Sequence, residues 1–442
     1  MNTPINDFLK KYSKDKFSRF HMPGHKGVEF LGVERYDITE IKGADELYNP
    51  KGIIMESENN ASSLFKTAHT FYSTEGSSHC IKAMLGVVTS FGNKKILAAR
   101  NVHKSFIYGA ALLDLDVDWL YPETPSHICS CRVSPNGLRE KLSGSNELPA
   151  AVYITSPDYL GNIQDIKGLS VVCKEFNVPL LVDNAHGAYL GFLEKSLHPI
   201  HLGATMCCDS AHKTLPVLTG GAYLHVAKNN CYQDLSTIRR MLALFASTSP
   251  SYLTLCSLDI CNKYLTDDIK DKLTKVCEMS LRLKQSIINK GWKISGDEPL
   301  KITIMCQNSG YSGFELADEL RKFSVEPEFS DRDVVVLMLS SETKEHDINR
   351  VLNAFDSIKR ISCNKSIEIP FISTPQRKQS VRNAIFSPQE TIKISDSVGR
   401  VCGAPLVSCP PAVPPVISGE VITENSIKLL SYYGLEEIQV VK

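Results

Sequence analysis

The sequence predicts an α/β fold in which helices cover a mostly parallel sheet. Short apolar runs alternate with longer amphipathic stretches through the middle of the chain, a pattern typical of repeated β-α-β units. The strand-like runs are apolar on both faces, as expected when helices cover both sides of a parallel sheet. Expected strands cover residues 95–99, 150–155, 179–182, 205–208 and 222–226, and expected helices between them cover 77–90, 104–113 and 169–176.

Changes of pattern predict four parts along the chain. An N-terminal segment (1–59) precedes a large domain (60–262), a smaller α/β domain (263–365) and a C-terminal domain (366–442). The smaller domain is expected to contain a long charged helix at 267–290, strands at 301–305 and 334–339, and a helix at 313–323. The large and the smaller domain both fall within the usual size range.

Charge and composition argue against several classes of partner. Lys+Arg and Asp+Glu are balanced at 49 each, so net charge gives no reason to expect nucleic acid or an anionic membrane. The chain has no apolar run of membrane-spanning length and no signal-peptide pattern at its start. Its 14 cysteines include no Cys-x-x-Cys pair, and Pro23-Gly24 interrupts the helical spacing of His21 and His25. We expect a cytoplasmic protein with no metal site and a small-molecule partner.

Two segments place candidate catalytic groups at the carboxyl ends of expected strands, where ligands collect in open α/β sheets. Asp183 ends one strand, and its carboxylate can pair with the protonated ring nitrogen of a pyridine cofactor. Lys213 follows a later strand, where partial desolvation would free its amine to attack an aldehyde. Taken singly, Asp183 could cap a turn and Lys213 could be a surface lysine. Their order, thirty residues apart, favours a shared site.

Further segments supply candidate phosphate ligands. Gly76, Ser77 and Ser78 open an expected helix, so that backbone N–H groups, the positive helix end and two hydroxyls together could hold a phosphate. An ordinary helix cap would use the same residues. Ser210 and His212 flank the candidate lysine with hydrogen-bonding side chains that suit a phosphate.

His103 follows the expected strand at 95–99 and could lie flat over an aromatic ring. An isolated histidine is more often structural. The four segments occur along the chain in the order phosphate cradle, ring stacker, ring-nitrogen partner and amine nucleophile. Their conjunction predicts a site for pyridoxal phosphate.

Motifs that run nearly end to end carry a resemblance to a known family. They are FHMPGHKG (20–27), DITE…GADEL (37–47), RNVHKS (100–105), DNAHG (183–187), SAHKTL (210–215), STSPSY (247–252) and SGE (418–420). Together they resemble the ornithine/lysine/arginine decarboxylase family of fold-type-I pyridoxal-phosphate enzymes. The resemblance implies that fold, with smaller C-terminal α/β domains and residues 366–442 as the C-terminal decarboxylase domain. The chain is similar to the short, biosynthetic-type members that lack an N-terminal wing domain.

The resemblance also implies roles for single residues. Lys213 would form the Schiff base with the cofactor, Asp183 would pair with its ring nitrogen, and His103 would stack on the ring. His186 would lie beside the cofactor, and Glu420 would bind the distal cation of the substrate. The other cofactor-binding positions would be Gly76, Ser77, Ser78, Ala185, Ser210 and His212, with Ser249 in the segment that reaches across a dimer interface to a partner's phosphate.

The activity that the resemblance implies is decarboxylation of a basic amino acid to the amine and CO₂, with a role in polyamine biosynthesis. Arginine is slightly preferred over lysine or ornithine, because short members often make agmatine, and a homodimer with sites at the subunit boundary is expected. Another fold-type-I activity, aminotransferase or lyase, stays open, although the arginines at 321 and 332 lack the context of a carboxylate clamp. A non-catalytic homolog also stays open, although it would have no reason to retain Lys213, Asp183 and His103.

Overall fold

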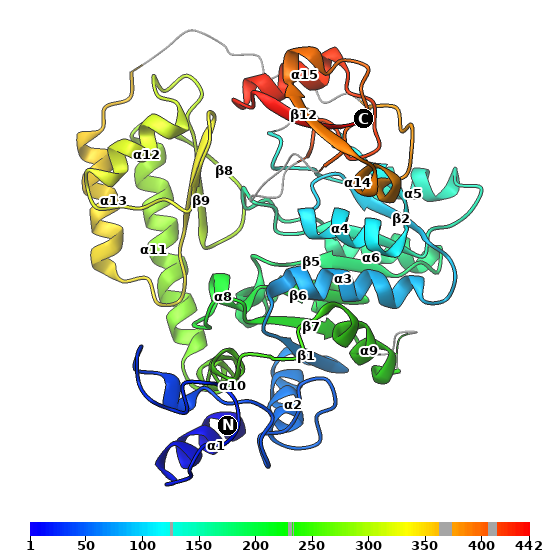
Figure 1. The fold of residues 1–442 in the computed structure, drawn as a ribbon. Helices are drawn as coiled ribbons and strands as arrows, with labels where there is room; N and C mark the ends of the chain where they lie inside the picture. The colour runs from blue at the N-terminus through cyan, green and yellow to red at the C-terminus, as the bar shows by residue number, and fades with distance from the viewer. Residues whose placement is uncertain (124–126, 229–231, 233, 362–373, 405–412) are drawn as a thin grey trace. The chain divides into compact units, whose positions relative to one another are not determined.

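The computed structural model describes residues 1–123, 127–228, 232, 234–361, 374–404 and 413–442. The backbone divides into two compact units, each assembled from separate stretches of chain (Figure 1). The first unit consists of Met1–Asn93, Leu148–Ser156 and Ile166–Asp271, and the second of Lys94–Glu147, Pro157–Asp165 and Lys272–Lys442. The division into four consecutive parts stays a prediction.

Five strands of the first unit form adjacent members of one sheet, in the order β1-β7-β6-β5-β4. They are β1 (His69–Ser73), β4 (Ala151–Thr155), β5 (Leu180–Asp183), β6 (Met206–Asp209) and β7 (Ala222–Val226). Strands β4, β5 and β6 are parallel, whereas β7 runs antiparallel to β6 and to β1. Every residue of these strands is buried. The carboxyl ends of β5 and β6 therefore meet at one edge, with Asp183 paired to Cys208.

Helices pack on this sheet because its strands are apolar on both faces. Helix α3 (Gly76–Thr89) contacts β1, β5, β6 and β7, and α9 (Leu235–Phe245) packs on α3. Helix α6 (Ile166–Glu175) contacts β5, and helix α7 (Pro199–Leu202) contacts β6. The one-turn helix α8 (Ala211–Thr214) follows β6 directly. The first unit also contains α1 (Pro4–Lys14), the 3₁₀ turn Glu34–Tyr36, α2 (Ile53–Phe65), the 3₁₀ turn Ala188–Phe192 and α10 (Tyr252–Asp267).

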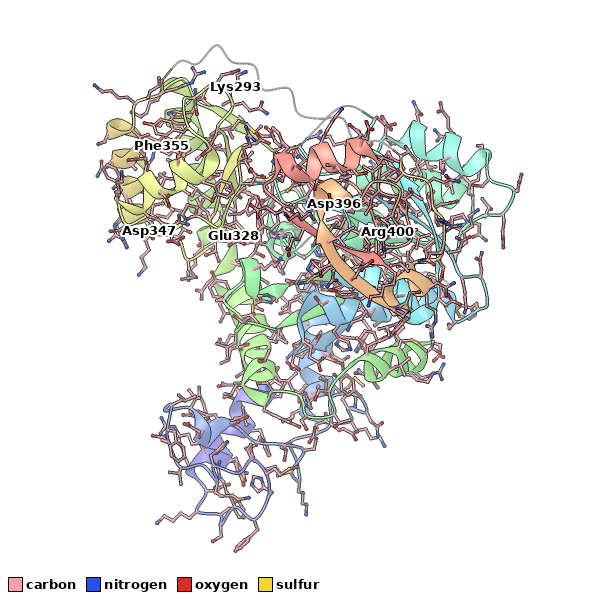
Figure 2. The ribbon with its side chains drawn as sticks, turned by 45° about the horizontal axis from the view of Figure 1, so that its top comes forward. Lys293, Glu328, Asp347, Phe355, Asp396 and Arg400 are labelled. Carbon is pink, nitrogen blue, oxygen red and sulfur yellow. The ribbon has the colours of Figure 1, made fainter. Side chains whose placement is uncertain are left out.

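The second unit begins with a β-α-β element. Strands β2 (Lys95–Ala99) and β3 (Asp116–Leu120) are parallel and joined by α4 (Lys104–Leu113). A four-stranded antiparallel sheet has the order β10-β11-β9-β8. Its strands are β8 (Lys293–Ser295), β9 (Lys301–Met305), β10 (Phe329–Ser330) and β11 (Val334–Met338), accompanied by α11 (Ile269–Asn289), α12 (Gly313–Arg321) and α13 (Glu345–Ser357). Phe355 on α13 (Figure 2) is buried edge-on against Trp292, with ring centres 5.4 Å apart.

The C-terminal part of the second unit has its own small core. Strands β12 (Gln389–Lys393) and β13 (Glu437–Val441) pair antiparallel, and helices α14 (Val381–Phe386) and α15 (Glu424–Tyr432) lie in the same part. Arg400 (Figure 2) donates to Glu390 on β12 and to the Val441 carbonyl on β13, at 2.7 and 2.9 Å. The remaining elements of the second unit are α5 (Pro135–Ser143) and the 3₁₀ turn Ile394–Asp396.

The predicted α/β fold with a mostly parallel sheet and smaller C-terminal α/β parts is confirmed. The strands at 95–99 and 222–226 lie at the predicted bounds. β5 and β6 are shifted by one residue, and β4 begins one residue later than predicted. Strands β1, β3, β8, β10, β12 and β13 were not predicted. Among the described residues, no helix combines the length and hydropathy needed to cross a membrane.

Candidate active site

Lys213 and His186 meet across the edge of the sheet in the first unit. Lys213 lies on α8, directly after β6, and its Nζ is 3.0 Å from Nε2 of His186. His186 is buried and belongs to the loop that follows the neighbouring strand β5. Two motifs that are well separated in the sequence are therefore in hydrogen-bonding contact.

Asp183 is a buried carboxylate at the end of β5, only 2% exposed. One oxygen accepts the backbone N–H of Ala185 at 3.1 Å, and the other accepts the Tyr153 hydroxyl at 3.3 Å. Burial raises the pKa of Asp183, and the charge of Lys213 and these hydrogen bonds oppose that shift only in part. A cation held against this carboxylate would stabilise the ionised form of Asp183 in addition to Lys213 and these hydrogen bonds. A protonated ring nitrogen therefore fits the electrostatics of the position.

The starts of α3 and α8 are joined by their serines. The Ser210 hydroxyl donates to the Ser77 hydroxyl at 2.8 Å, and Ser77 is buried while Ser78 is half-buried. Gly76 has φ +72°, and no atom lies within 4 Å of the place where a Cβ would stand. The first turn of the 14-residue helix α3 thus offers N–H groups and hydroxyls on an open approach. These residues fit a phosphate group.

His212 is held by the backbone of the first unit. Its Nδ1 lies 2.9 Å from the Gly221 carbonyl oxygen, so this nitrogen carries the proton and donates. Burial lowers the pKa of His212, which favours the neutral ring with an unprotonated Nε2. Such a ring accepts rather than donates a hydrogen bond at Nε2, so the phosphate role of His212 stays a prediction.

His103 and Ser249 also stay predictions. His103 belongs to the second unit, where it caps α4: its Nδ1 accepts the Ser105 N–H at 3.1 Å and lies 2.8 Å from the Ser105 hydroxyl. Ser249 lies in the first unit with its side chain exposed, and its N–H donates to the Ser247 hydroxyl at 3.2 Å. The cap fixes the His103 ring through one nitrogen.

Glu420 is engaged inside the second unit. Both of its oxygens accept from Arg100, each at 2.6 Å, and the N–H of Ile417 donates to one of them at 2.8 Å. Both charged side chains are buried. The predicted contact of Glu420 with a substrate cation is untested, and the Arg100 ion pair counts against it because the carboxylate already has a partner of opposite charge.

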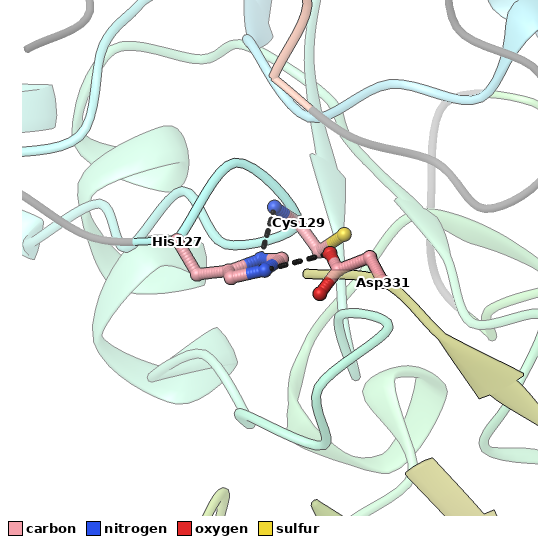
Figure 3. Close-up of side chains that lie close together, drawn as sticks. All are labelled: His127, Cys129 and Asp331. Carbon is pink, nitrogen blue, oxygen red and sulfur yellow. Dashed lines mark hydrogen bonds and ion pairs between the residues drawn. The ribbon is translucent and has the colours of Figure 1, made fainter. Parts of the chain in front are cut away.

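A cluster of potential metal ligands in the second unit has an internal hydrogen bond and an ion pair of its own. One donor atom each from His127, Cys129 and Asp331 lies within 4.8 Å of the others (Figure 3). His127 Nδ1 accepts the Cys129 N–H at 3.1 Å, so the ring proton is on Nε2, which faces Asp331 at 2.9 Å. Burial raises the pKa of the Cys129 thiol well above its usual range. A metal would need to displace both protons, so these contacts favour a structural role.

The sequence did not predict the contacts of two residues near the site, Tyr153 and Asn184. Tyr153 lies two residues before the end of β4, a parallel strand beside β5, and that position was its only signal. Asn184 follows Asp183 directly and donates its amide to Asp209 at 2.7 Å. Its place inside a motif pointed to function, but not to this partner.

The comparisons with known proteins identify the family. Residues 3–328 match the family model described as Orn/Lys/Arg decarboxylase, major domain. The chain belongs to this family. The expected resemblance, the enzyme class of amino-acid decarboxylase and the cofactor pyridoxal phosphate are thereby confirmed, and the substrate class is a basic amino acid.

Relatives of known sequence extend over nearly the whole chain. An arginine decarboxylase of Bacillus subtilis is 28% identical over 97% of this chain and 93% of its own length, and one of Bacillus anthracis is 27% identical over 97% and 92%. Uncharacterized protein YaaO of Bacillus subtilis is 28% identical over 98% and 94%.

Solved structures agree on the fold. The Francisella novicida lysine decarboxylase LdcF has a TM-score of 0.83 at 17% identity, covering 100% of this chain and 81% of that one. The constitutive lysine decarboxylase of E. coli has a TM-score of 0.80 at 16% identity, covering 100% and 82%. At these identities the likeness concerns the fold alone.

Proposed function

We propose that this protein decarboxylates arginine to agmatine and CO₂, using pyridoxal phosphate bound at Lys213. The observation that carries the proposal is the meeting of the Lys213 amine with His186 beside the buried Asp183, at the ends of two parallel strands. The preference for arginine is supported by relatives named arginine decarboxylase that match over more than nine-tenths of this chain.

Each residue would make a distinct contribution. When bound, pyridoxal phosphate supplies an electron sink for the electron pair of the bond between Cα and the carboxylate. Lys213 Nζ would hold the cofactor through its aldehyde carbon, and His186 Nε2, 3.0 Å away, would accept the ammonium proton and so leave the amine free. Asp183 holds the proton on the ring nitrogen through its buried carboxylate.

Other groups would orient the cofactor. The Ser77 hydroxyl would donate to a phosphate oxygen while it accepts from Ser210 at 2.8 Å. The N–H groups of α3 after Gly76, whose own N–H donates to the Gly220 carbonyl at 2.7 Å, would bind the phosphate as well. The family motif predicts that His103 stacks on the ring. Correct orientation matters because the bond that breaks must lie parallel to the π orbitals of the cofactor.

A second copy of this chain is the partner that we propose. Five apolar side chains between residues 17 and 31, namely Phe17, Phe20, Met22, Phe30 and Leu31, are 64% to 96% exposed. Apolar clusters of this kind commonly mark interaction surfaces. The homodimer would cover this segment and bring Ser249 of each copy toward the other copy's site.

The dimer is tested by light scattering after gel filtration. Phe20→Ser with Phe30→Ser should shift the protein toward the monomer, whereas Phe91→Ser, at an exposed phenylalanine outside this segment, should leave the dimer unchanged. A monomeric wild-type protein at micromolar concentration would contradict this part of the proposal.

The cytoplasm is the proposed location, and agmatine would enter polyamine synthesis. All eleven cysteines among the described residues are free thiols, and nine of them are buried. Thiols in this state suit a reducing compartment.

The substrate is tested by product identification. The cofactor-loaded protein is incubated separately with arginine, lysine and ornithine, and the amine and CO₂ are measured. We expect agmatine from arginine at the highest kcat/KM. Turnover of lysine or ornithine in place of arginine would correct the substrate, and no CO₂ from any of the three would refute the proposed reaction.

A further inference from the structure

Asp209 is a fully buried carboxylate that the proposed reaction does not use. It ends β6, and three side-chain N–H groups converge on it. Oδ2 accepts from Nε2 of His198 at 2.9 Å and of His225 at 3.0 Å, and Oδ1 accepts from the Asn184 amide at 2.7 Å. Three donors on one carboxylate are enough to keep it ionised in the absence of water.

The histidines are fixed as donors by their other nitrogens. His198 Nδ1 accepts the Ile200 N–H at 3.3 Å, and His225 Nδ1 lies 2.9 Å from the Thr70 hydroxyl. Because a carboxylate can only accept, each ring carries a proton on Nε2, facing Asp209. Although burial alone would raise it, the two histidines hold the pKa of Asp209 well below its usual range. Asp209 is therefore a fixed negative charge.

Asn184 connects this fixed charge to the candidate active site. It directly follows Asp183 at the end of β5, and Asp209 directly precedes Ser210, the cap of the turn that carries Lys213. The bond between Asn184 and Asp209 therefore joins the loop of the ring-nitrogen partner to the loop of the amine nucleophile.

The shape of the loop fits the same orientation of the amide. A Cβ on Gly187 would stand 2.0 Å from Oδ1 of Asn184, so the oxygen occupies the space that any other residue at 187 would need. Because a carboxylate can only accept, Nδ2 must be the atom that faces Asp209. Asn184 is fully buried, with its amide nitrogen against Asp209 and its amide oxygen against Gly187.

We propose that the Asn184–Asp209 pair is the positioning element that holds Asp183 and Lys213 in register for the cofactor. The proposal rests on the proposed function of Lys213. Neither Asn184 nor Asp209 contacts the cofactor in this account. Their effect is transmitted through the residues next to them in the chain.

Exchanging the two side chains tests the pair. In Asn184→Asp alone, two carboxylates face each other, and in Asp209→Asn alone, two amide nitrogens face each other unless Asn184 turns. In the double exchange N184D/D209N, the amide nitrogen introduced at position 209 donates to the carboxylate introduced at position 184, while the amide oxygen accepts from both histidines, so the hydrogen bond between the two loops is kept with its direction reversed. The readouts are cofactor affinity of the apoprotein, and the visible absorbance of the lysine-bound cofactor as a function of pH.

We expect each single variant to bind pyridoxal phosphate at least roughly tenfold more weakly, the effect of losing one charge-assisted hydrogen bond. The pH midpoint of the absorbance should shift as well, most in Asn184→Asp, because repulsion grows as both carboxylates ionise. The double exchange should return both readouts toward the wild-type values. If the single variants do not fold, the double exchange must still fold and bind the cofactor.

Thr205 provides the matched control at the opposite end of the same two strands. Its hydroxyl accepts the Leu180 N–H at 3.1 Å, so it also joins β6 to β5. Thr205→Val should lower the melting temperature without changing cofactor affinity or the pH midpoint.

Three results would overturn the proposal: single variants that behave like Thr205→Val, a double exchange no better than the single variants, or a double exchange that fails to fold. Failure of the proposed function is distinct, because wild-type protein would then carry no cofactor on Lys213 at all.

Discussion

Arg100 and Glu420 form a buried ion pair whose disruption separates two roles of Glu420. Both terminal nitrogens of Arg100 donate to the carboxylate at 2.6 Å, and the side chains are 0% and 5% exposed. Glu420→Ala would leave a buried guanidinium without this carboxylate. Removing one partner of a buried pair costs about 3–5 kcal/mol, because the remaining charge keeps its desolvation penalty.

The other contacts of Arg100 do not change this magnitude. Its guanidinium carbon lies 5.2 Å from the ring centres of both Trp119 and Tyr121, and one nitrogen is 3.4 Å from the Pro414 carbonyl oxygen. These contacts exist before and after the substitution, so they do not offset the loss. Removing both charges, in Arg100→Met with Glu420→Leu, should cost less than Glu420→Ala, because no buried charge remains.

Urea unfolding followed by tryptophan fluorescence measures the effect. Both tryptophans of the chain, Trp119 and Trp292, lie in the second unit, so the signal reports that unit. We expect a clearly lower urea midpoint for Glu420→Ala and an intermediate one for the double variant. An unchanged midpoint together with a large rise in the KM for arginine would refute this reasoning and assign Glu420 to the substrate cation.

Three further predictions concern other parts of the molecule. Burial raises the pKa of Asp259 to about 6, against its hydrogen bonds from Ser57 and the start of α1. The folded protein therefore binds this proton more tightly than the unfolded chain, and the stabilisation, roughly 3 kcal/mol, is lost as pH rises from about 4 through 6. Asp259→Asn should flatten the dependence of melting temperature on pH between about 4 and 6, and an unchanged slope would contradict this. Gly187→Ala should destabilise the fold by about 1–3 kcal/mol through the clash with Asn184, as measured by thermal unfolding; a wild-type melting temperature would be inconsistent with the loop geometry. Elemental analysis of the purified protein should find no stoichiometric zinc, because His127 Nδ1 already accepts the Cys129 N–H and burial raises the pKa of the Cys129 thiol; one zinc per chain that is lost in His127→Ala would disprove the structural role of that cluster.

Apolar patterning predicted strands in which most residues are apolar, such as KILAA and AYLHV, and missed β1 and β3, in which polar residues are more frequent. Strand β1 has the sequence HTFYS, and its polar groups are satisfied by side chains: His69 bonds to Glu58, Thr70 to His225 and Ser73 to His79. One of these partners, His225, lies 155 residues away in the sequence, and the local sequence does not show that Glu58 and His79 bond to this strand, so the burial of its polar residues could not be predicted. Strand β3 begins with two aspartates in three residues, which likewise conceals a strand that is only partly buried.

The sequence allows contacts that depend on strand ends to be predicted, but not contacts that depend on strand register. Asp183 and Lys213 follow strands that the sequence predicts, so their proximity could be expected. The contact of Asp209 with His225 depends on the antiparallel pairing of β6 and β7, in which Cys207 stands opposite His225 and Asp209 lies two residues farther on the same face. The ion pair between Glu420 and Arg100 also could not be predicted from the sequence. Arg100 belongs to a different family motif, in which no role had been assigned to its charge.

Chemical trapping of the cofactor tests the central claim most directly. The cofactor-loaded protein is reduced with borohydride, digested and mapped by mass spectrometry, with Lys213→Ala treated in parallel. We predict that the reduced cofactor is found on Lys213 alone, and that Lys213→Ala lacks both the label and the visible absorbance. A label on another lysine, or turnover by Lys213→Ala comparable to wild type, would contradict the account.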